Sequence, residues 1–289
     1  MSNALRDSAF MARPASISDL EARAHVLDIP TVSGPVRWRS FGSGSPLLLL
    51  HGGHGSWLHW VRNIEPLSAR FRVLVPDMPG FGDSCDLDES GSLDAPLQRL
   101  TLALKCGLDQ LVSKSAAVDV AGFSFGGLVA AHLQRVRGFR RLVLLGPAGH
   151  GSPWRREVQM PPWRDSGPDT RQSKLAENLS YFMIHEARCI DAAALYAQEI
   201  SSLRARYHVR NVSRASRLGE LLRECAAPIH FAWGQHDATG FAEKVGPELV
   251  EGVPARKWSE IPRAAHWVQF ERADLVNALI SDWCAESLP

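Results

Sequence analysis

The fold is decided by the stretch Gly122-Phe123-Ser124-Phe125-Gly126-Gly127, which stands between two apolar segments. Residues 117–121 before it are typical of a buried strand, and residues 128–136 after it are typical of a helix. In this context the pattern G-x-S-x-G predicts a nucleophile elbow, a sharp turn that exposes a serine hydroxyl. We expect Ser124 near a helix N-terminus, where N–H groups and the helix dipole favour a developing negative charge. Taken alone, the pattern also fits a glycine-rich turn without a catalytic role.

A second motif, His51-Gly52-Gly53, ends an apolar run at residues 46–50. Such a run predicts a buried parallel strand that leads into a loop. The loop can offer a backbone N–H group to an oxyanion, and the N–H group after the nucleophile is then the other donor. We therefore predict Gly53 and Phe125 as oxyanion-hole donors, with Gly52 as the alternative to Gly53. The glycines also suit a tight strand-to-loop turn.

Two polar residues follow the predicted C-terminal strands. Asp237 comes after the apolar segment 228–234, and His266 comes after the predicted strand 256–261. With Ser124 they occur in the chain order nucleophile, acid, base, each beyond the end of a predicted strand, where open α/β sheets bind ligands. A serine hydroxyl is a poor nucleophile until a base removes its proton, and histidine titrates near neutral pH. We therefore predict His266 as the base and Asp237 as the group that orients and stabilises it.

Two other histidines lie close to these motifs in the sequence. His236 stands beside Asp237 but does not follow the last predicted strand, so we interpret it as a loop residue. His51 is interpreted as a residue that orders the glycine loop, because it sits at the strand end and not in the predicted position of the base.

Together these motifs resemble those of the α/β-hydrolase superfamily. The segments that carry the resemblance are residues 51–53, 76–84, 122–127, 233–237 and 265–267. The resemblance implies an α/β-hydrolase fold: a mostly parallel, eight-stranded sheet flanked by helices, with a helical cap insertion. It also implies that Asp77, which is a rival candidate for the acid, belongs to a structural turn after the fourth strand.

Within this superfamily the chain is most similar to meta-cleavage-product hydrolases, which cleave a carbon–carbon bond in vinylogous diketone acids. The similarity rests on residues 51–53, on Trp57 with Arg62-Asn63-Ile64, and on His266-Trp267. It implies four substrate-pocket positions, which here are His59, Phe123, Gln198 and Trp267. Three of them depart from that family, which has asparagine at the positions of His59 and Phe123 and arginine at that of Gln198. The arginine holds a substrate carboxylate, and nearby arginines could replace it here: Arg188, Arg204 and Arg206.

The chain divides into three predicted parts. Residues 1–20 form an N-terminal extension, either partly disordered or a partner-binding arm; residues 21–148 and 223–289 form the core; residues 149–222 form the helical cap. In the core we expect antiparallel strands at 24–29 and 36–41, central parallel strands at 47–50 and 71–75, further strands at 117–121 and 141–145, and a helix at 97–112.

The predicted cap begins with a linker rich in glycine and proline, followed by helices at 172–185 and 190–209. A cap excludes water and supplies substrate contacts. Its large apolar residues are either pocket walls or packing residues: Trp154, Trp163, Tyr181, Phe182 and Met183. Its basic cluster either holds a carboxylate or faces solvent: Arg204, Arg206, Arg210, Arg214 and Arg217.

Composition limits the partners that we expect. The chain of 289 residues has a net charge of +1, which does not favour nucleic acid or an anionic membrane. It has no apolar run of membrane-spanning length and no apolar signal region at its start. Its five cysteines are odd in number and scattered, so we expect reduced thiols and a cytoplasmic location. We expect a small-molecule substrate, and the chain could form a homodimer.

The chemistry that these residues predict is acyl transfer from an ester or a similar carbonyl compound, without a metal or organic cofactor. An alcohol as leaving group would make the protein a carboxylesterase. A carbanion equivalent would make it a carbon–carbon bond hydrolase of aromatic degradation. Two alternatives also stay open: a ligand receptor that keeps the hydrolase fold, and a lyase that forms no acyl-enzyme.

Overall fold

One sheet organises the protein, whose computed structural model describes residues 11–92, 94–155, 161–215 and 217–286. Within these ranges the sheet has eight strands in the order β1-β2-β4-β3-β5-β6-β7-β8. The strands are β1 His25–Thr31, β2 Gly34–Phe41, β3 Ser45–Leu50, β4 Phe71–Pro76, β5 Asp119–Phe123, β6 Arg141–Leu145, β7 Ile229–Gly234 and β8 Arg256–Ile261. Only β2 runs antiparallel to its neighbours β1 and β4, and the remaining pairs are parallel. The predicted mostly parallel sheet with an antiparallel start is confirmed.

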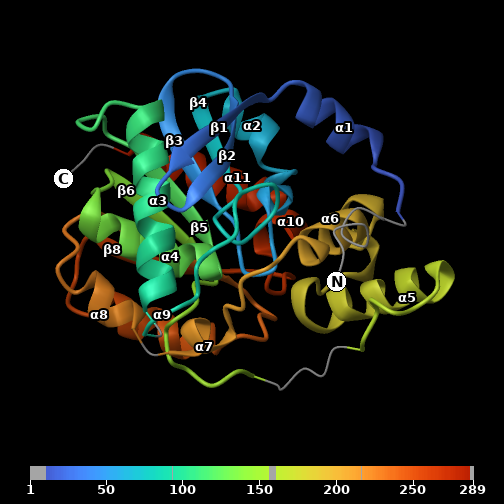
Figure 1. The fold of residues 1–289 in the computed structure, drawn as a ribbon. Coiled ribbons are helices and arrows are strands. Elements are labelled where there is room, and N and C mark those ends of the chain that lie inside the picture. The colour runs from blue at the N-terminus through green and yellow to red at the C-terminus, as the bar shows by residue number, and fades with distance from the viewer. Residues whose placement is uncertain (1–10, 93, 156–160, 216, 287–289) are drawn as a thin grey trace.

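Helices cover both faces of this sheet, as Figure 1 shows. The helices of the core are α1 Ala15–Ala22, α2 Ile64–Ser68, α3 Ala95–Leu111, α4 Phe125–Val136, α9 Ala242–Val250, α10 Val268–Glu271 and α11 Ala273–Ala285. In β3, Leu47 and Leu49 pack with α2 and α11, whereas Leu48 and Leu50 pack with α3 and α4. This alternation explains why the strand is apolar throughout: it is buried on both faces.

The predicted cap region contains helices beside the sheet (Figure 1). They are α5 Pro168–Asn178, the π-helical turn η3 Leu179–Met183, the short turn η4 Ala187–Cys189, α6 Ala192–Leu203, α7 Arg210–Arg214 and α8 Leu218–Leu222. The prediction of one helix over residues 190–209 is wrong, because α6 ends at Leu203. The N–H groups of Arg206 and Tyr207 donate to the carbonyl of Gly80, at 2.8 and 3.2 Å, and so leave the helical path.

The described part of the predicted N-terminal extension packs against the protein. Ile17 and Leu20 of α1 are buried in the same apolar cluster as α2 and α11. Ahead of α1, Arg13 Nε donates to the Tyr196 hydroxyl of α6 at 2.8 Å. The segment thus joins the core to the cap region. The first ten residues of the predicted extension lie outside the described ranges.

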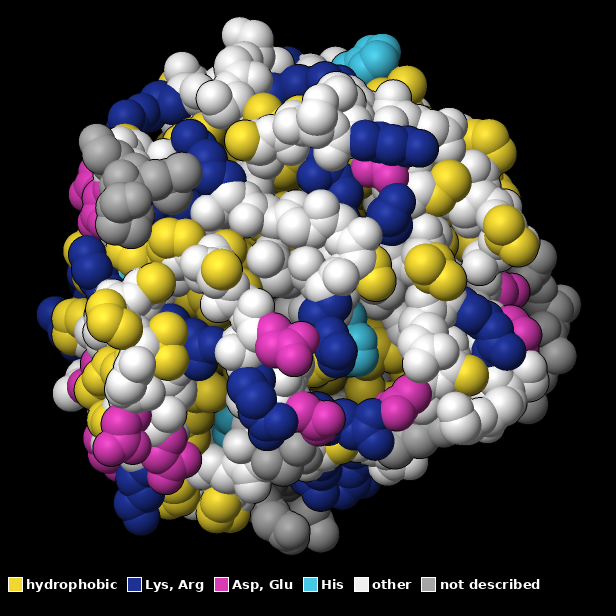
Figure 2. Space-filling view, turned by 90° about the vertical axis from the view of Figure 1, so that its left-hand side faces the viewer, with side chains coloured by type: hydrophobic (Ala, Val, Ile, Leu, Met, Phe, Trp, Pro, Cys, Tyr) yellow, Lys and Arg dark blue, Asp and Glu magenta, His cyan; other side chains and the backbone are white. Residues whose placement is uncertain are grey.

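On the face seen in Figure 2, acidic side chains lie among more numerous basic ones, and several of them are adjacent. The whole chain has a net charge of +1. None of the helices in the described ranges is both long enough and apolar enough to cross a membrane.

Acid should weaken the fold through two histidines away from the elbow, His132 in α4 and His230 in β7. Burial lowers the pKa of each to about 4, whereas an unfolded histidine titrates near 6.5. The unfolded chain therefore binds more protons between these values, so stability falls as the pH drops from about 6.5 towards 4, by up to about 1.4 kcal/mol per pH unit for each histidine. Urea unfolding of wild type and His132→Gln at pH 7.5, 6 and 5 measures this. The free energy of unfolding should fall less steeply with decreasing pH in the variant than in wild type. An identical pH dependence in the two proteins would contradict a lowered pKa of His132.

Candidate active site

Ser124 sits at the tip of a strained turn between β5 and α4. Its backbone has φ 53° and ψ −117°, a conformation that non-glycine residues rarely adopt. The neighbouring glycines make the turn possible: a Cβ atom at Gly122 would lie 2.6 Å from the Gly126 carbonyl oxygen, and one at Gly126 would lie 2.4 Å from that of Leu50. The turn directs the Ser124 hydroxyl away from the sheet and into a cavity.

The structure brings Ser124, His266 and Asp237 together, from the loops that follow β5, β8 and β7. His266 Nε2 lies 2.9 Å from Ser124 Oγ, and His266 Nδ1 lies 2.9 Å from Asp237 Oδ2. Both His266 and Asp237 are buried. An ionised carboxylate only accepts hydrogen bonds, so we assign the proton to Nδ1, which leaves Nε2 to accept the Ser124 proton.

Asp237 is held in its ionised form by its neighbours. Burial alone would raise its pKa, but the adjacent His266 and the hydrogen bonds from His266 and Thr239 hold that pKa below its usual value. The backbone N–H of Thr239 donates to Asp237 Oδ1 at 2.8 Å, and its hydroxyl donates to the same oxygen at 2.7 Å. The sequence analysis missed Thr239, although an aspartate in a turn commonly accepts a hydrogen bond from the backbone N–H two residues on.

The predicted oxyanion donors border the same cavity as Ser124. Gly53 and Phe125 both line it. Among the described residues, neither of their N–H groups has a hydrogen-bond partner, so both can serve a ligand. The N–H of Gly52, the alternative donor, instead donates to His59 Nδ1 at 3.2 Å. A Cβ atom at Gly53 would lie 2.5 Å from Val209 Cγ2, so a larger residue here would displace Val209 where the loop meets the cap region.

His51 orders the glycine loop, as the sequence suggested. Its Nε2 accepts from the Met78 N–H at 3.0 Å, and its Nδ1 lies 2.8 Å from the Gly52 carbonyl, to which it donates. Burial lowers the pKa of His51, so the ring is neutral and can hold both groups. His236, which we interpreted from the sequence as a loop residue, stacks on His185 with ring centres 3.7 Å apart.

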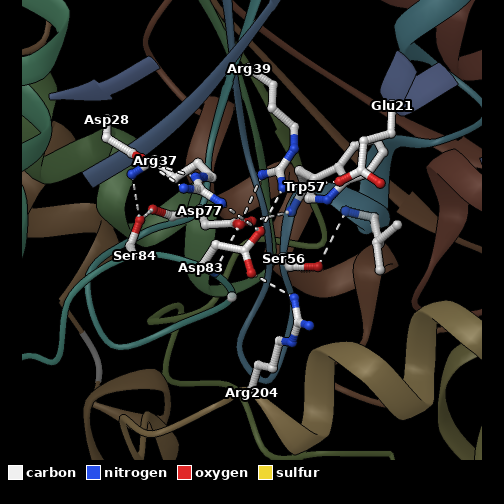
Figure 3. A network of polar contacts seen from close by, with 12 residues as sticks. Glu21, Asp28, Arg37, Arg39, Ser56, Trp57, Asp77, Asp83, Ser84 and Arg204 are labelled. Atoms are coloured by element: carbon white, nitrogen blue, oxygen red, sulfur yellow. Dashed lines mark hydrogen bonds and ion pairs between the residues drawn. The ribbon is translucent and has the colours of Figure 1, made fainter. Parts of the chain in front are cut away.

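Asp77, the rival acid, belongs to a separate network that Figure 3 shows. Its Oδ2 accepts from Arg39 at 3.0 Å, and its Oδ1 accepts from the Trp57 N–H at 2.8 Å. Arg39 also pairs with Asp83 at 2.7 Å, and Asp83 accepts from Arg204 at 2.6 Å. The network therefore ties the glycine loop to β2 and to the segment after α6.

Two adjoining cavities share part of their lining. The first has a volume of about 290 Å³ and contains Ser124, His266 and both predicted donors. The second has a volume of about 370 Å³ and extends under the cap region. Four residues line both cavities: Gly53, His54, Phe182 and Met183. A substrate whose reacting carbonyl lies at Ser124 in the first cavity could extend one arm past the shared residues into the second.

The four predicted pocket residues take different places. Phe123 lines the first cavity, and His59 and Gln198 line the second. The Gln198 amide donates to Ser202 Oγ at 3.1 Å. Trp267 is fully buried and lines neither of these two cavities; its indole N–H donates to the His59 carbonyl at 3.0 Å. Burial holds the pKa of His59 well below its ordinary value, so His59 is a neutral group.

The large apolar and basic residues predicted for the cap also differ in whether they line a cavity. Trp154, Phe182 and Met183 line the first cavity, and Trp163 lines the second with Phe182 and Met183. Of the basic residues, only Arg210 and Arg214 line the first cavity, and Arg188, Arg204 and Arg206 line neither. Two histidines of the first cavity escaped the sequence analysis, His54 and His150, because an isolated histidine in a loop carries no pattern.

Comparison of sequences identifies relatives along most of the chain. The family model described as "Alpha/beta hydrolase family" matches residues 47–279. A 2-hydroxy-6-oxononadienedioate/2-hydroxy-6-oxononatrienedioate hydrolase of Cupriavidus pinatubonensis is 30% identical over 269 residues, which cover 84% of this chain and 88% of the relative. A 2-hydroxy-6-oxo-6-phenylhexa-2,4-dienoate hydrolase of Burkholderia cepacia is 28% identical, covering 84% of this chain and 89% of the relative.

Comparison of structures agrees on the fold. A serine hydrolase from Cycloclasticus zankles superposes with a TM-score of 0.73 at 19% identity, covering 91% of this chain and 100% of that chain. A carboxylesterase from Bacillus subtilis superposes with a TM-score of 0.72 at 17% identity, covering 95% of this chain and 97% of that chain. At these identities the likeness shows the fold alone. The family match and the sequence relatives go further, and this chain belongs to the alpha/beta hydrolase family.

Proposed function

We propose that the protein is a serine hydrolase of a small carboxylic ester or similar carbonyl compound. The observation that carries this proposal is the chain of two 2.9 Å contacts from Asp237 through His266 to Ser124, which ends in a cavity. A buried carboxylate, an imidazole and a hydroxyl in this order are the parts that nucleophilic acyl transfer requires.

The proposed reaction has two halves. His266 Nε2 takes the Ser124 proton while Oγ attacks the carbonyl carbon, and the oxyanion accepts hydrogen bonds from the N–H groups of Gly53 and Phe125. His266 then gives its proton to the leaving group as the bond to that group breaks, which leaves an ester on Ser124. In the second half, His266 takes a proton from water, the hydroxide attacks the ester, and the returned proton frees Ser124 and the acid.

A second candidate is the hydrolysis of a carbon–carbon bond, in which the leaving group is a carbanion equivalent that His266 protonates. The sequence relatives favour it, since two of them are named as hydrolases of oxo-dienoate acids. His59 and Gln198 supply neutral polar groups in the second cavity where those enzymes are expected to have asparagine and arginine. Esters therefore remain the first candidate substrates.

A test in two arms separates these candidates. One arm follows the release of p-nitrophenol from short p-nitrophenyl esters, and the other follows the loss of absorbance of a coloured dienol from catechol ring cleavage. Both arms compare wild type with Ser124→Ala. Ester turnover without bleaching supports the esterase, and rapid bleaching that depends on Ser124 supports the carbon–carbon hydrolase. Tight ligand binding without turnover in either arm would contradict both and favour a receptor.

Thr239→Val should lower kcat without preventing folding. The change keeps the shape of the side chain and the backbone N–H, but removes one of the hydrogen bonds that Asp237 Oδ1 accepts. A charge-assisted hydrogen bond of this kind is worth about 1.5–3 kcal/mol, and part of that should appear as a kcat reduced about tenfold. Steady-state kinetics across pH 5–9 measures it, and an unchanged kcat would contradict the supporting role of Thr239.

A further inference from the structure

The first cavity has an unusual charge balance for a site in a nearly neutral protein. Its described lining residues include two arginines, Arg210 and Arg214, and no aspartate or glutamate. The rest of the lining is largely apolar and aromatic. A cavity with an apolar body and cations at one side suits a ligand with an apolar body and an anion at one end.

These two arginines differ from the other members of the same basic cluster. Arg204 pairs with Asp83, Arg206 with Asp86, and Arg217 with Asp94. For Arg210 and Arg214, by contrast, no carboxylate in the described ranges lies within ion-pair distance. Arg204, Arg206 and Arg217 are thus paired with carboxylates, whereas Arg210 and Arg214 are exposed at the edge of the cavity, where their charges can face a ligand.

A wall of aromatic rings connects Arg214 with Ser124. The Arg214 guanidinium carbon lies 4.6 Å from the ring centre of Trp154, which fixes its position by a cation–π contact. Trp154 lies 5.5 Å from Phe182, and Phe182 lies 5.0 Å from His266, measured between ring centres. His266 Nε2 is in turn 2.9 Å from Ser124 Oγ. A flat apolar arm that follows this wall would place one end at Ser124 and the other at Arg214.

The spacing of Arg210 and Arg214 also favours a bound anion. Arg210 and Arg214 are four residues apart on α7, so their side chains share one side of this short helix. Like charges at this spacing repel each other and destabilise a helix. A bound anion would remove the repulsion. The N–H of Gly149 donates to the Ser213 carbonyl at 2.9 Å, which ties α7 to the loop after β6 and keeps both arginines at the cavity.

We infer that Arg210 and Arg214 form an anion subsite for a carboxylate of the substrate, at the end of an apolar arm whose other end is the reacting carbonyl. This inference rests on the proposed function, because it places the reacting carbonyl at Ser124. The subsite lies in the first cavity, away from Gln198 in the second. The substrate class is therefore a carbonyl compound that is also an acid.

Ligand binding tests the subsite without requiring turnover. Calorimetry on the full chain compares benzoate with benzamide, which share a shape but differ in charge, for wild type, Arg210→Gln/Arg214→Gln and Arg223→Gln. Arg223 is the matched control, because it is an exposed arginine just after α8 that lines neither cavity. Wild type and Arg223→Gln should bind benzoate about tenfold or more tightly than benzamide, as expected for bidentate arginine contacts. Added salt should reduce this preference, and the double variant should lose it.

Equal affinity for the two ligands in wild type, or a preference that survives in the double variant, would overturn the inference. Kinetics adds a second readout with matched ester pairs: p-nitrophenyl hydrogen glutarate against p-nitrophenyl pentanoate, and 4-acetoxybenzoate against its methyl ester. The double variant should raise KM for the acid of at least one pair by a clearly larger factor than KM for its neutral partner. Turnover of neutral esters without a charge preference would overturn the subsite but keep the hydrolase. A charge preference in binding without any turnover would support the subsite and overturn the proposed hydrolase.

Discussion

Ser124→Ala is expected to lower kcat/KM by about 10⁴-fold or more, because a serine hydrolase without its nucleophile keeps only the contribution of the oxyanion hole and of binding. Ser124 is the one group that His266 Nε2 contacts at 2.9 Å in the cavity, among the described residues. Steady-state kinetics on the best ester measures the loss. The variant should still bind ligands in the cavity. The equilibrium affinity for the acid that the ester releases should therefore change little.

Ser213→Ala is the matched control for this prediction. Ser213 lines the same cavity but makes no hydrogen bond to His266 among the described residues. Its loss should change kcat only slightly. Equal and small losses in both serine variants would show that the elbow does not provide the nucleophile.

Asp77→Ala is expected to destabilise the fold by about 3–5 kcal/mol, because it leaves a buried arginine with one partner fewer. The side chains of Arg39 and Asp77 are 2% and 1% exposed, so solvent cannot replace the lost contact. The N–H groups of Trp57 and Asp83 also lose their acceptor. Urea unfolding followed by circular dichroism measures the change in the free energy of unfolding.

Asp28→Ala provides the comparison. Asp28 accepts two hydrogen bonds from Arg37, another arginine of β2, but it is 47% exposed. An exposed pair contributes about 0–1 kcal/mol. The account therefore predicts a large difference between two arginine–aspartate pairs on one strand. Similar losses in the two variants would contradict the structural role of Asp77.

The sequence predicted the sheet and the position of the elbow because both depend on local patterns. The strand before Ser124 is buried at every residue, which happens where helices cover both faces of a sheet. The glycines beside Ser124 are required by close backbone contacts. Asp237 and His266 could be located because each follows a strand directly. Residues in such positions meet at one edge of a parallel sheet regardless of the distance between them in the sequence.

The arrangement of the cap region could not be predicted in the same way. Residues 204–209 have helical composition, but the carbonyl of Gly80, far away in the sequence, binds the N–H groups of Arg206 and Tyr207. Likewise, five arginines look alike in the sequence, and only the placement of Asp83, Asp86 and Asp94 separates the paired ones from Arg210 and Arg214. Such distinctions arise from tertiary contacts and leave no local pattern.

The most direct test of the central claim is to trap the acyl-enzyme. Wild type is mixed with a p-nitrophenyl ester, quenched in acid within the burst of p-nitrophenol release, digested and analysed by mass spectrometry. The account predicts that the peptide containing Ser124 gains the mass of the acyl group, and that Asp237→Asn, which weakens His266, shows a smaller burst. Rapid turnover with no adduct, or an adduct on another residue, would contradict the proposed serine mechanism.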